Sequence, residues 1–489
     1  MRVTRLLVPA LALLAASALA QDQPEIQARR LLEDGRAYWA QGKMKQALDN
    51  FNIIVTSFSN TESVGQALLE IGRYRMEVEG DAERARAAFD EVAKKYPQSD
   101  GAPGAYYYLG YLTLSRGTSP AELDDALAQF TRVQNLYPRS SWVPRAIYAS
   151  GLAHRKAGRL SEAVEAERRV SLEYPSSEAA PAAQFEIGQC LALTGEPLRG
   201  MEEFQQVRNR FPSSPWAAQA LERITALYRL HGSGKPTFSL DAGFSAGAGD
   251  LLKDVRAILV APGGGLWIAS DKTRSAVLLE PGGKTATSLA AEDLRTLSLS
   301  PRGDLVLASK LAVRIGPRDI KTFSVPSDKP GVPEPLERVL AAAVMPGGSI
   351  LVSDEKRKKV YRFDSRGQHA GTFPDAKERE VTRLYVDSEG GIVMLDREER
   401  TVRVFDETGR LLRTAGPGGL RKPADVAVDA FRNAYVADEE AGILVFTPQG
   451  QLLATIAGPE LKRPKALALD PTGAILVYDD RAEKVMRYR

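Results

Sequence analysis

The spacing of apolar residues changes at residues 232–236 of this 489-residue chain. Before this point apolar residues recur three or four positions apart, which is typical of helices with one buried face. After it, short runs alternate apolar with polar residues and end at Pro-Gly or Gly-Gly turns, which is typical of strands. The pattern predicts an all-α repeat array over residues 21–231, a linker at 232–236, and an all-β repeat array over 237–489.

Aromatic-proline pairs mark the period of the helical half. They recur at spacings of 41, 37 and 37 residues, as Tyr96-Pro97, Tyr137-Pro138, Tyr174-Pro175 and Phe211-Pro212. Proline cannot continue a helix and restricts the residue before it, so each pair ends one helical hairpin. A second signal, an apolar pair at i and i+3, recurs as Phe51/Ile54, Phe89/Val92, Phe130/Val133 and Phe204/Val207. Five hairpins and a closing helix from about residue 215 to 230 are predicted.

These units resemble the tetratricopeptide repeat. The fourth unit carries the family's small, turn, apolar and terminal-proline residues at Gly151, Gly158, Ala163, Val170 and Pro175. The segments YPQS, YPRSSWVPRA, YPSSEAAPAA and FPSSPWAAQA are similar to the repeats of bacterial envelope proteins, especially the cell-division coordinator of the Tol-Pal system. The resemblance implies a solenoid with a concave groove that binds a peptide or helix of another envelope protein.

Two residues depart from that pattern. Glu167 stands where the family has Phe, and Gly200 where it has Ala. A buried carboxylate without a partner is costly, so we expect Glu167 to tilt toward solvent or to pair with a nearby arginine. The fourth repeat is therefore predicted to be a local weak point.

Aromatic residues on the first helices are the candidate binding residues of the groove. They include Tyr107, Tyr111 and Trp142. Exposed aromatic rings often anchor a protein partner. The alternative is that most of these rings pack between helices and only one or two are exposed.

The β half repeats about every 40 residues, and six turns align at spacings of 39, 45, 42, 42 and 41. The turns lie at Pro262, Pro301, Pro346, Ser388, Ala430 and Pro471. This period predicts a six-bladed β-propeller. An aspartate follows the second strand of five blades, at Asp271, Asp354, Asp396, Asp438 and Asp479, and we interpret it as a turn residue that accepts backbone N–H groups.

The run PADVAVDAFRNAYVADEEAGILVFTPQGQLLATIAG, with RPKALALDPTGAILVYDD after it, resembles the NHL repeat family. The resemblance implies a ring that binds a protein or ligand on one face. The sixth blade supplies only three strands before the chain ends, so residues 237–241 (TFSLD) are predicted to close the ring by pairing with it.

Four basic residues near the starts of inner strands are the second set of candidate binding residues. We expect Arg256, Arg295, Arg383 and Lys465 to lie in the same register of their blades, where they would form an anion-attracting channel mouth if they converge; the alternative is solvated strand ends. Oxygen ligands for a calcium ion are available nearby at Asp254, Asp293, Glu380 and Asp425. The propeller half contains one histidine, which excludes a multi-histidine zinc site within it.

The first twenty residues resemble a cleaved secretory signal. Arg2 and Arg5 precede an apolar run, and Ala18 and Ala20 are spaced for cleavage before Gln21, which is not cysteine. The prediction is a periplasmic or secreted protein without a lipid anchor or a membrane-spanning segment after cleavage. A single cysteine, Cys190, allows no internal disulfide.

The sequence therefore predicts an extracytoplasmic scaffold without a reaction of its own. The net charge of +3 is spread over nearly balanced halves, which disfavours nucleic acid as a partner. The helical groove and the propeller face would each bind an envelope protein or peptide, and no cofactor or metal is predicted. The alternative is a metal-dependent hydrolase of the lactonase or esterase type in the propeller channel; a glycan binder ranks last.

Overall fold

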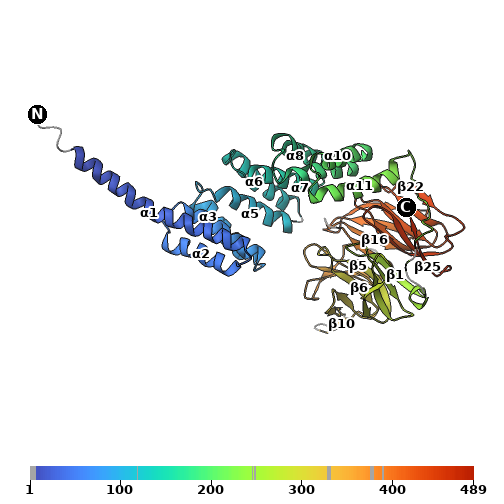
Figure 1. Cartoon of the computed structure of the whole chain (residues 1–489). Coiled ribbons are helices and arrows are strands. Elements are labelled where there is room, and N and C mark those ends of the chain that lie inside the picture. Colours follow the sequence, from blue (N-terminus) through green and yellow to red (C-terminus); the bar gives the residue numbers. More distant parts are fainter. Residues whose placement is uncertain are drawn as a thin grey trace, which may run out of the picture. The chain divides into compact units, whose positions relative to one another are not determined.

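A computed structural model describes residues 7–489 except 118, 245, 247–248, 328–331, 375–378 and 388–389, with side chains from residue 23. The chain divides into two compact units, Met1–Ala183 and Gln184–Arg489. Figure 1 shows helices in the first part of the chain and β-sheets in the second, which confirms the predicted fold class.

Eleven α-helices lie in the part of the chain that the structure describes. They are α1 (Leu7–Ala40), α2 (Met44–Ser57), α3 (Ser63–Glu77), α4 (Ala82–Lys95), α5 (Ala102–Arg116), α6 (Pro120–Leu136), α7 (Val143–Lys156), α8 (Leu160–Glu173), α9 (Ala180–Leu193), α10 (Pro197–Arg210) and α11 (Pro215–His231). The five predicted hairpins and the closing helix are confirmed. Among the described helices, none combines the length and the apolar character needed to cross a membrane.

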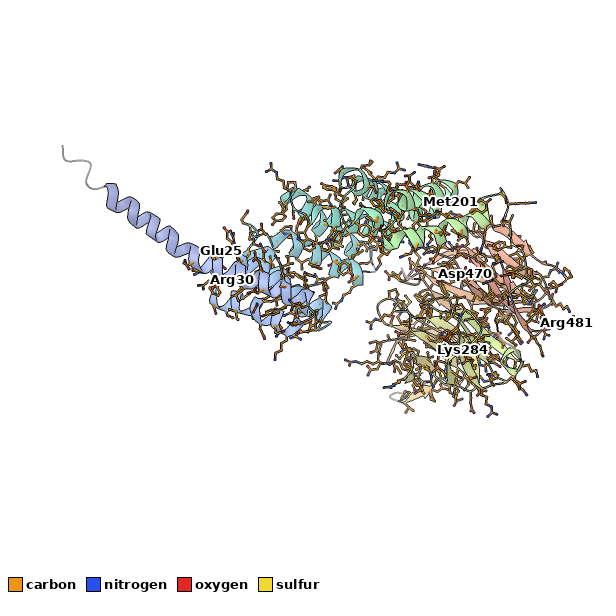
Figure 2. The ribbon with its side chains drawn as sticks, viewed as in Figure 1. Glu25, Arg30, Met201, Lys284, Asp470 and Arg481 are labelled. Atoms are coloured by element: carbon orange, nitrogen blue, oxygen red, sulfur yellow. The ribbon has the colours of Figure 1, made fainter. Side chains whose placement is uncertain are left out.

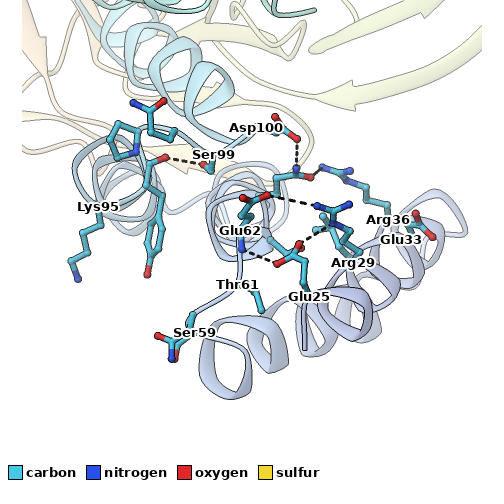
Figure 3. A pocket seen from close by; sticks show the side chains of 17 residues that line it. Glu25, Arg29, Glu33, Arg36, Ser59, Thr61, Glu62, Lys95, Ser99 and Asp100 are labelled. Carbon is cyan, nitrogen blue, oxygen red and sulfur yellow. Dashed lines mark hydrogen bonds and ion pairs between the residues drawn. The ribbon is translucent and has the colours of Figure 1, made fainter. Parts of the chain in front are cut away.

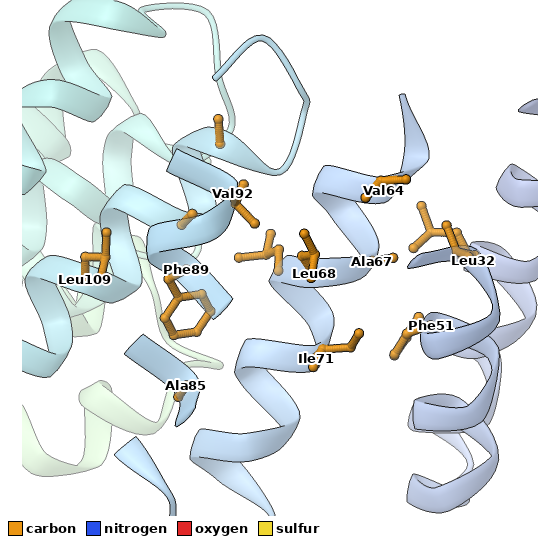
Figure 4. Close-up of a cluster of buried hydrophobic side chains, with 14 of the residues drawn as sticks. Leu32, Phe51, Val64, Ala67, Leu68, Ile71, Ala85, Phe89, Val92 and Leu109 are labelled. Carbon is orange, nitrogen blue, oxygen red and sulfur yellow. The ribbon is translucent and has the colours of Figure 1, made fainter. Parts of the chain in front are cut away.

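The core of the first unit forms where a phenylalanine of the second helix meets a glycine of the first helix, in the hairpins α1–α2, α3–α4 and α5–α6. Phe89 of α4 lies against Gly72 of α3 so closely that a Cβ there would be 2.4 Å from the ring. Phe51 meets Gly35 in the same way, and both phenylalanines are fully buried. Figure 4 shows Phe51 and Phe89 in one cluster with Leu68 and Ile71 of α3. Glycine at these positions therefore sets the distance between paired helices.

Glu167 on α8 is buried, with 1% of its surface exposed. Its carboxylate lies where the phenylalanines of other repeats lie, because a Cβ on Gly151 would be 2.1 Å from Oε1. Of the two expectations for Glu167, the tilt toward solvent is wrong, and the pairing with an arginine stays a prediction. The glycine leaves room for a side chain that then occupies the Phe position in the core.

The second unit contains six sheets arranged as propeller blades, confirming the predicted six. Blade one is β1 (Val255–Val260), β2 (Leu266–Ser270), β3 (Ser275–Leu279) and β4 (Thr285–Ala290), and blade two is β5 (Leu294–Leu299), β6 (Leu305–Ser309), β7 (Val313–Ile315) and β8 (Asp319–Lys321). Blade three is β11 (Val339–Val344), β12 (Ile350–Asp354), β13 (Lys359–Phe363) and β14 (His369–Thr372), and blade four is β15 (Val381–Val386), β16 (Ile392–Asp396), β17 (Thr401–Phe405) and β18 (Leu411–Ala415).

Blade five is β19 (Pro423–Val428), β20 (Ala434–Asp438), β21 (Gly442–Phe446) and β22 (Leu452–Ile456), and blade six is β23 (Pro464–Leu469), β24 (Ile475–Asp479) and β25 (Lys484–Tyr488). Strands β9 (Ser324–Pro326) and β10 (Pro333–Pro335) pair separately, and the 3-10 helix η1 (Gly249–Leu252) precedes the first blade. Five predicted turns join the first two strands of their blades; the sixth, at Ser388, lies outside the described residues.

The ring closes as predicted. Leu240 forms a β-bridge with Tyr488 of β25, beside the three-stranded sixth blade. The inner strand β23 also contacts β1 of blade one. Charged side chains such as Lys284 and Arg481 are exposed around the blades (Figure 2).

The last helices pack on the propeller within the second unit. The rings of Phe204 on α10 and Phe431 in the β19–β20 turn lie 6.4 Å apart, and Phe431 is buried. Gln189 of α9 donates a hydrogen bond to the carbonyl of Ala430 in the same turn. The two compact units therefore meet between residues 183 and 184. The domain limits predicted from the repeat periods, with a linker at 232–236, stay a prediction.

Candidate functional site

A β-bulge in the inner strand of every blade directs one side chain toward the centre of the ring. In each strand the pairing register shifts between the first and third residues, and the six skipped residues are Arg256, Arg295, Leu340, Thr382, Ala424 and Lys465. All six line one cavity of about 370 Å³, together with Leu294, Glu355, Glu380, Arg383, Arg397 and Glu439. Bulges re-aim side chains in this way. Because each blade contributes, the cavity lies at the mouth of the central channel, and we call it the channel-mouth pocket.

The structure brings the four predicted basic residues together in this pocket. Arg256, Arg295 and Lys465 occupy the same bulged position in blades one, two and six. Arg383 does not: it follows the bulged Thr382 by one residue, so the expectation that all four share a register is wrong for Arg383. That one-residue difference gives its side chain a different role.

Arg383 connects three blades at the wall of the pocket. Its Nε donates to Asp425 of blade five at 2.7 Å, and one terminal nitrogen donates to the carbonyl oxygen of Arg256 in blade one at 3.1 Å. Asp425 also accepts the backbone N–H of Leu467 in blade six at 2.8 Å. Burial raises the pKa of Asp425, while the Arg383 charge and the hydrogen bonds oppose that rise. The pair is a structural cross-link, and it uses both carboxylate oxygens of Asp425.

The three bulged basic residues differ in their partners. Arg256 forms ion pairs with Asp271 at 2.7 Å and Asp254 at 3.2 Å, and Lys465 with Asp480 at 3.3 Å. Burial, and then the charge of Arg256, lower the pKa of Lys465. Arg295 has no ion pair within the described residues, and its Nε is buried without a hydrogen-bond partner there.

The carboxylates considered for calcium are not assembled into a metal site. The described residues contain no group of three or more His, Cys, Asp or Glu side chains that could hold an ion. Of the four candidates, only Glu380 lines the pocket, whereas Asp425 is engaged beneath it. The described residues therefore do not bring the four predicted calcium ligands together.

The repeated aspartates act as turn residues, as predicted. Asp438 accepts the backbone N–H groups of Arg421 and Lys422 at 2.7 and 2.9 Å through one oxygen. The other oxygen accepts from Glu440 and Ala441, both at 3.0 Å. Asp479 accepts four backbone N–H groups in the same arrangement. Asp271, Asp354 and Asp396 each accept a backbone N–H group as well, and their other oxygen pairs with an arginine. The aspartates therefore hold connections between strands together.

The candidate aromatic residues of the first unit form one cluster. The ring of Tyr107 on α5 lies 5.3 Å from Trp142, 5.9 Å from Phe130 and 6.3 Å from Tyr111. Burial raises the pKa of Tyr107 to about 12. Tyr111 is 44% exposed, whereas Tyr107 and Trp142 are half-buried. Tyr111 is thus the exposed ring of the three, stacked on Tyr107, which in turn packs on Trp142.

Two cavities at the junctions between repeats escaped the sequence analysis. The first cavity, of about 670 Å³, is lined by residues that include Glu25, Arg29, Glu62 and Lys95. The second, of about 710 Å³, is lined by residues that include Tyr106, Leu136 and Trp142. Residues 97–100 line both cavities. In the first, the Ser63 hydroxyl donates to Glu25 at 2.8 Å, and Arg29 donates at 2.9 Å (Figure 3). Burial would raise the pKa of Glu25, but these hydrogen bonds outweigh it and lower the pKa. The sequence signal for these cavities is the repeated Tyr-Pro-x-Ser motif, which we interpreted only as the end of a helix.

Comparisons with known proteins bear mainly on the first unit. The family model described as tetratricopeptide repeat matches residues 66–99, which include α4 and most of α3. No curated protein matches the chain. These residues are therefore similar to that repeat family, whereas the Tol-Pal and NHL resemblances stay predictions.

Solved structures similar to the chain include β-propellers. A streptogramin B lyase is 10% identical, with a TM-score of 0.39, over 52% of this chain and 97% of that one. A virginiamycin B lyase from Staphylococcus aureus, in a structure with quinupristin, is 15% identical over 51% and 85%, with a TM-score of 0.39. The WD40 β-propeller domain of Doa1 is 14% identical over 51% and 84%, with a TM-score of 0.40. At these TM-scores the likeness carries no argument about activity.

Proposed function

We propose that this protein is an extracytoplasmic scaffold that binds an envelope protein through the aromatic cluster of its helical unit. Tetratricopeptide repeats and propellers suggest protein–protein interaction. The observation that carries the proposal is the arrangement of Tyr111, exposed above the packed rings of Tyr107 and Trp142. An aromatic ring held in place by its neighbours loses little conformational freedom on binding, which is the property of an interface hot spot.

The partner that fits this surface carries an apolar or aromatic side chain next to an acidic one. The Arg145 guanidinium lies over the Trp142 ring, 5.2 Å from its centre; it forms an ion pair with Glu178 and is partly exposed. Its positive charge would complement a carboxylate on a bound helix or peptide, while Tyr111 provides apolar contact. Such a partner would bind as a segment laid along the first helices.

An extracytoplasmic location is the second component of the proposal. It is supported by the resemblance of residues 1–20 to a secretory signal, with cleavage before Gln21. Residues 1–6 lie outside the described residues, so this part is tested only by experiment. Fractionation of expressing cells, with N-terminal sequencing of the mature chain, would support it if the protein starts at Gln21 in the envelope fraction, and would contradict it if Met1 is retained in the cytoplasm.

A capture experiment tests the binding function. Full-length protein, a Tyr111→Ala variant and a Leu172→Ala variant would each be used as bait with envelope extract. Leu172 is 76% exposed on α8 and serves as the matched control. The proposal predicts a protein that the wild type and Leu172→Ala recover and that Tyr111→Ala recovers at least about tenfold less, as for a hot-spot residue. Equal recovery by all three would contradict it.

A further inference from the structure

Charged side chains of the channel-mouth pocket are divided between its two halves. Blades six, one and two contribute the cations Lys465, Arg256 and Arg295. Blades three, four and five contribute carboxylates at Glu355, Glu380 and Glu439, each next to the start of an inner strand or the end of the strand paired with it. Because blades follow one another around the ring, one half of the pocket wall is basic and the other mainly acidic. Blade four supplies two exceptions, Arg397 and Arg383, of which Arg383 is paired with Asp425.

Several of these charges have no counter-charge among the residues that the structure describes. Arg256 and Lys465 pair with aspartates, and Glu439 pairs with Lys422 at 2.8 Å. Within the described residues, no ion pair is formed by the side chains of Arg295, Arg397, Glu355 and Glu380. The pocket therefore presents two unpaired cations and two unpaired carboxylates to whatever enters it.

Two buried polar atoms of the bulged residues also have no hydrogen-bond partner in the described part of the chain. They are Nε of Arg295 and Oγ1 of Thr382, a residue only 7% exposed that lines the pocket from blade four. A buried donor without an acceptor destabilises a protein, so such groups are uncommon unless they serve a ligand or bound water. Arg295 donates and Thr382 can donate or accept, which makes both suitable partners for a carboxylate.

We propose that the channel-mouth pocket binds a small zwitterion, an amino acid or a short peptide, with its carboxylate at Arg295 and its ammonium group facing Glu355 and Glu380. Arg256 and Lys465 add positive charge on the carboxylate side. The cavity of about 370 Å³ is within the usual range for small-ligand sites, roughly 300–1,000 Å³. Burial and the charge of Arg256 lower the pKa of Lys465, which reflects how close the cations of this half lie to one another.

Ligands with a single charge fit this pocket less well. A simple anion would satisfy Arg295 but leave Glu355 and Glu380 without a counter-charge, and a simple amine would do the reverse. A ligand that carries both groups satisfies both halves at once. This inference does not depend on protein binding by Tyr111, which lies on a helix of the first unit.

Isothermal titration calorimetry on the full-length protein tests the proposal, with glycine, glycylglycine, acetate and ethylamine as probes. The proposal predicts that at least one zwitterion binds at least about tenfold more tightly than acetate or ethylamine, since charge-assisted hydrogen bonds form at both ends. Tighter binding of glycine would identify a free amino acid as the ligand, and tighter binding of glycylglycine a peptide. Absence of zwitterion binding at about millimolar concentrations, or equal binding of a singly charged probe, would overturn it.

Two variants assign the ends of the ligand. Arg295→Gln is expected to weaken binding of the zwitterion and of acetate about tenfold, the cost of one charged hydrogen bond. Glu380→Gln is expected to weaken the zwitterion only. Arg302→Gln and Glu280→Gln, at exposed residues of blades two and one, are matched controls and should bind as the wild type does. Unchanged zwitterion binding by Arg295→Gln, with an unchanged thermal transition showing that the variant is folded, would overturn the assignment. If capture of an envelope protein still depends on Tyr111, the zwitterion proposal fails while the proposed scaffold function stands.

Discussion

The backbones of Ser239 and Arg489 exchange two hydrogen bonds, each 3.0 Å long, so residues near the beginning and at the end of the propeller are paired as neighbouring strands. The amide of Asp241 adds a third, to the carbonyl oxygen of Arg487 at 2.8 Å. The ring is therefore held closed by main-chain pairing and by the side chains beside it.

Deletion of residues 237–241 should lower the thermal transition of the propeller, because it removes these three hydrogen bonds and exposes the edge of β25. We expect a shift of roughly 5 °C or more, from the usual relation between stability and melting temperature. Differential scanning calorimetry measures it, with Lys235→Ala as a control at a residue before the pairing. A melting temperature equal to that of the wild type would show that the closure is dispensable.

The closure should also weaken in acid. A hydrogen bond from Arg487 at 2.9 Å, with the charges of Arg487 and Arg489, lowers the pKa of Asp241 below its ordinary value. A lowered carboxyl pKa stabilises the folded state above the unfolded-state value of about 3.9, and this stability is lost as the pH falls further, through the lowered pKa.

The measurement for Asp241 is the melting-temperature difference between the wild type and Asp241→Asn as a function of pH. It should be constant between about pH 5 and 8 and shrink below about pH 4. Glu337→Gln, at an exposed residue, should show no such dependence. A difference that grows in acid would contradict the assignment of this ion pair.

Removal of Asp425 should strongly destabilise the propeller, because it leaves the Arg383 guanidinium without its counter-charge among three blades. The expected loss for Asp425→Ala is about 3–5 kcal/mol in the free energy of unfolding. The double variant Arg383→Met/Asp425→Leu should recover part of that loss, since no charge is then stranded. Urea denaturation measures both; a loss under about 1 kcal/mol for Asp425→Ala would mean that the cross-link contributes little.

The packing of α10 and α11 on blade five should depend on Phe431. Its ring is buried in a cluster that includes Phe204 and Leu227, so Phe431→Ala is expected to cost about 3–5 kcal/mol. Hydrogen exchange should become faster in α10 and α11 and remain unchanged in α4 of the first unit. Leu311→Ala, at an exposed residue of blade two, is the control. Unaltered exchange in the two helices would contradict this packing.

Glu167→Phe should stabilise the fourth repeat. The carboxylate occupies the position that phenylalanine holds against Gly35, Gly72 and Gly110 in other repeats. Replacing a buried charged group by an apolar one of suitable shape often gains about 1–4 kcal/mol. Thermal denaturation should show a higher transition for the first unit, while Glu162→Phe on the same helix should not raise it. A lower transition for Glu167→Phe would show that the partners of Glu167 contribute more than a core phenylalanine can.

The sequence was sufficient for features that depend on local periodicity. Aromatic-proline pairs located the hairpins, and the missing fourth strand of blade six identified residues 237–241 as the closing segment. Features that depend on pairing register were not predictable. A bulge moves Thr382 into the position that Arg256 has in blade one, and only the strand pairing reveals this shift.

Contacts between distant segments were missed for a similar reason. Phe431 is in a turn, and nothing in its neighbourhood along the chain indicates that it packs on Phe204. The burial of Glu167 was missed because its residue type predicts exposure, although Gly151 opposite it offered the same space as the glycines that face phenylalanine.

Photo-crosslinking from position 111 asks most directly whether the helical unit binds a protein partner. A photoreactive phenylalanine analogue would replace Tyr111 in one variant and Leu172 in another, and cross-linked products from expressing cells would be identified by mass spectrometry. Both residues are exposed, at 44% and 76%, so accessibility alone favours the control. We predict that one envelope protein is cross-linked from position 111 and not from position 172. Excess unlabelled wild type should reduce this cross-link, whereas excess Tyr111→Ala should not. The same products from both positions, or none from 111, would contradict the proposed scaffold function.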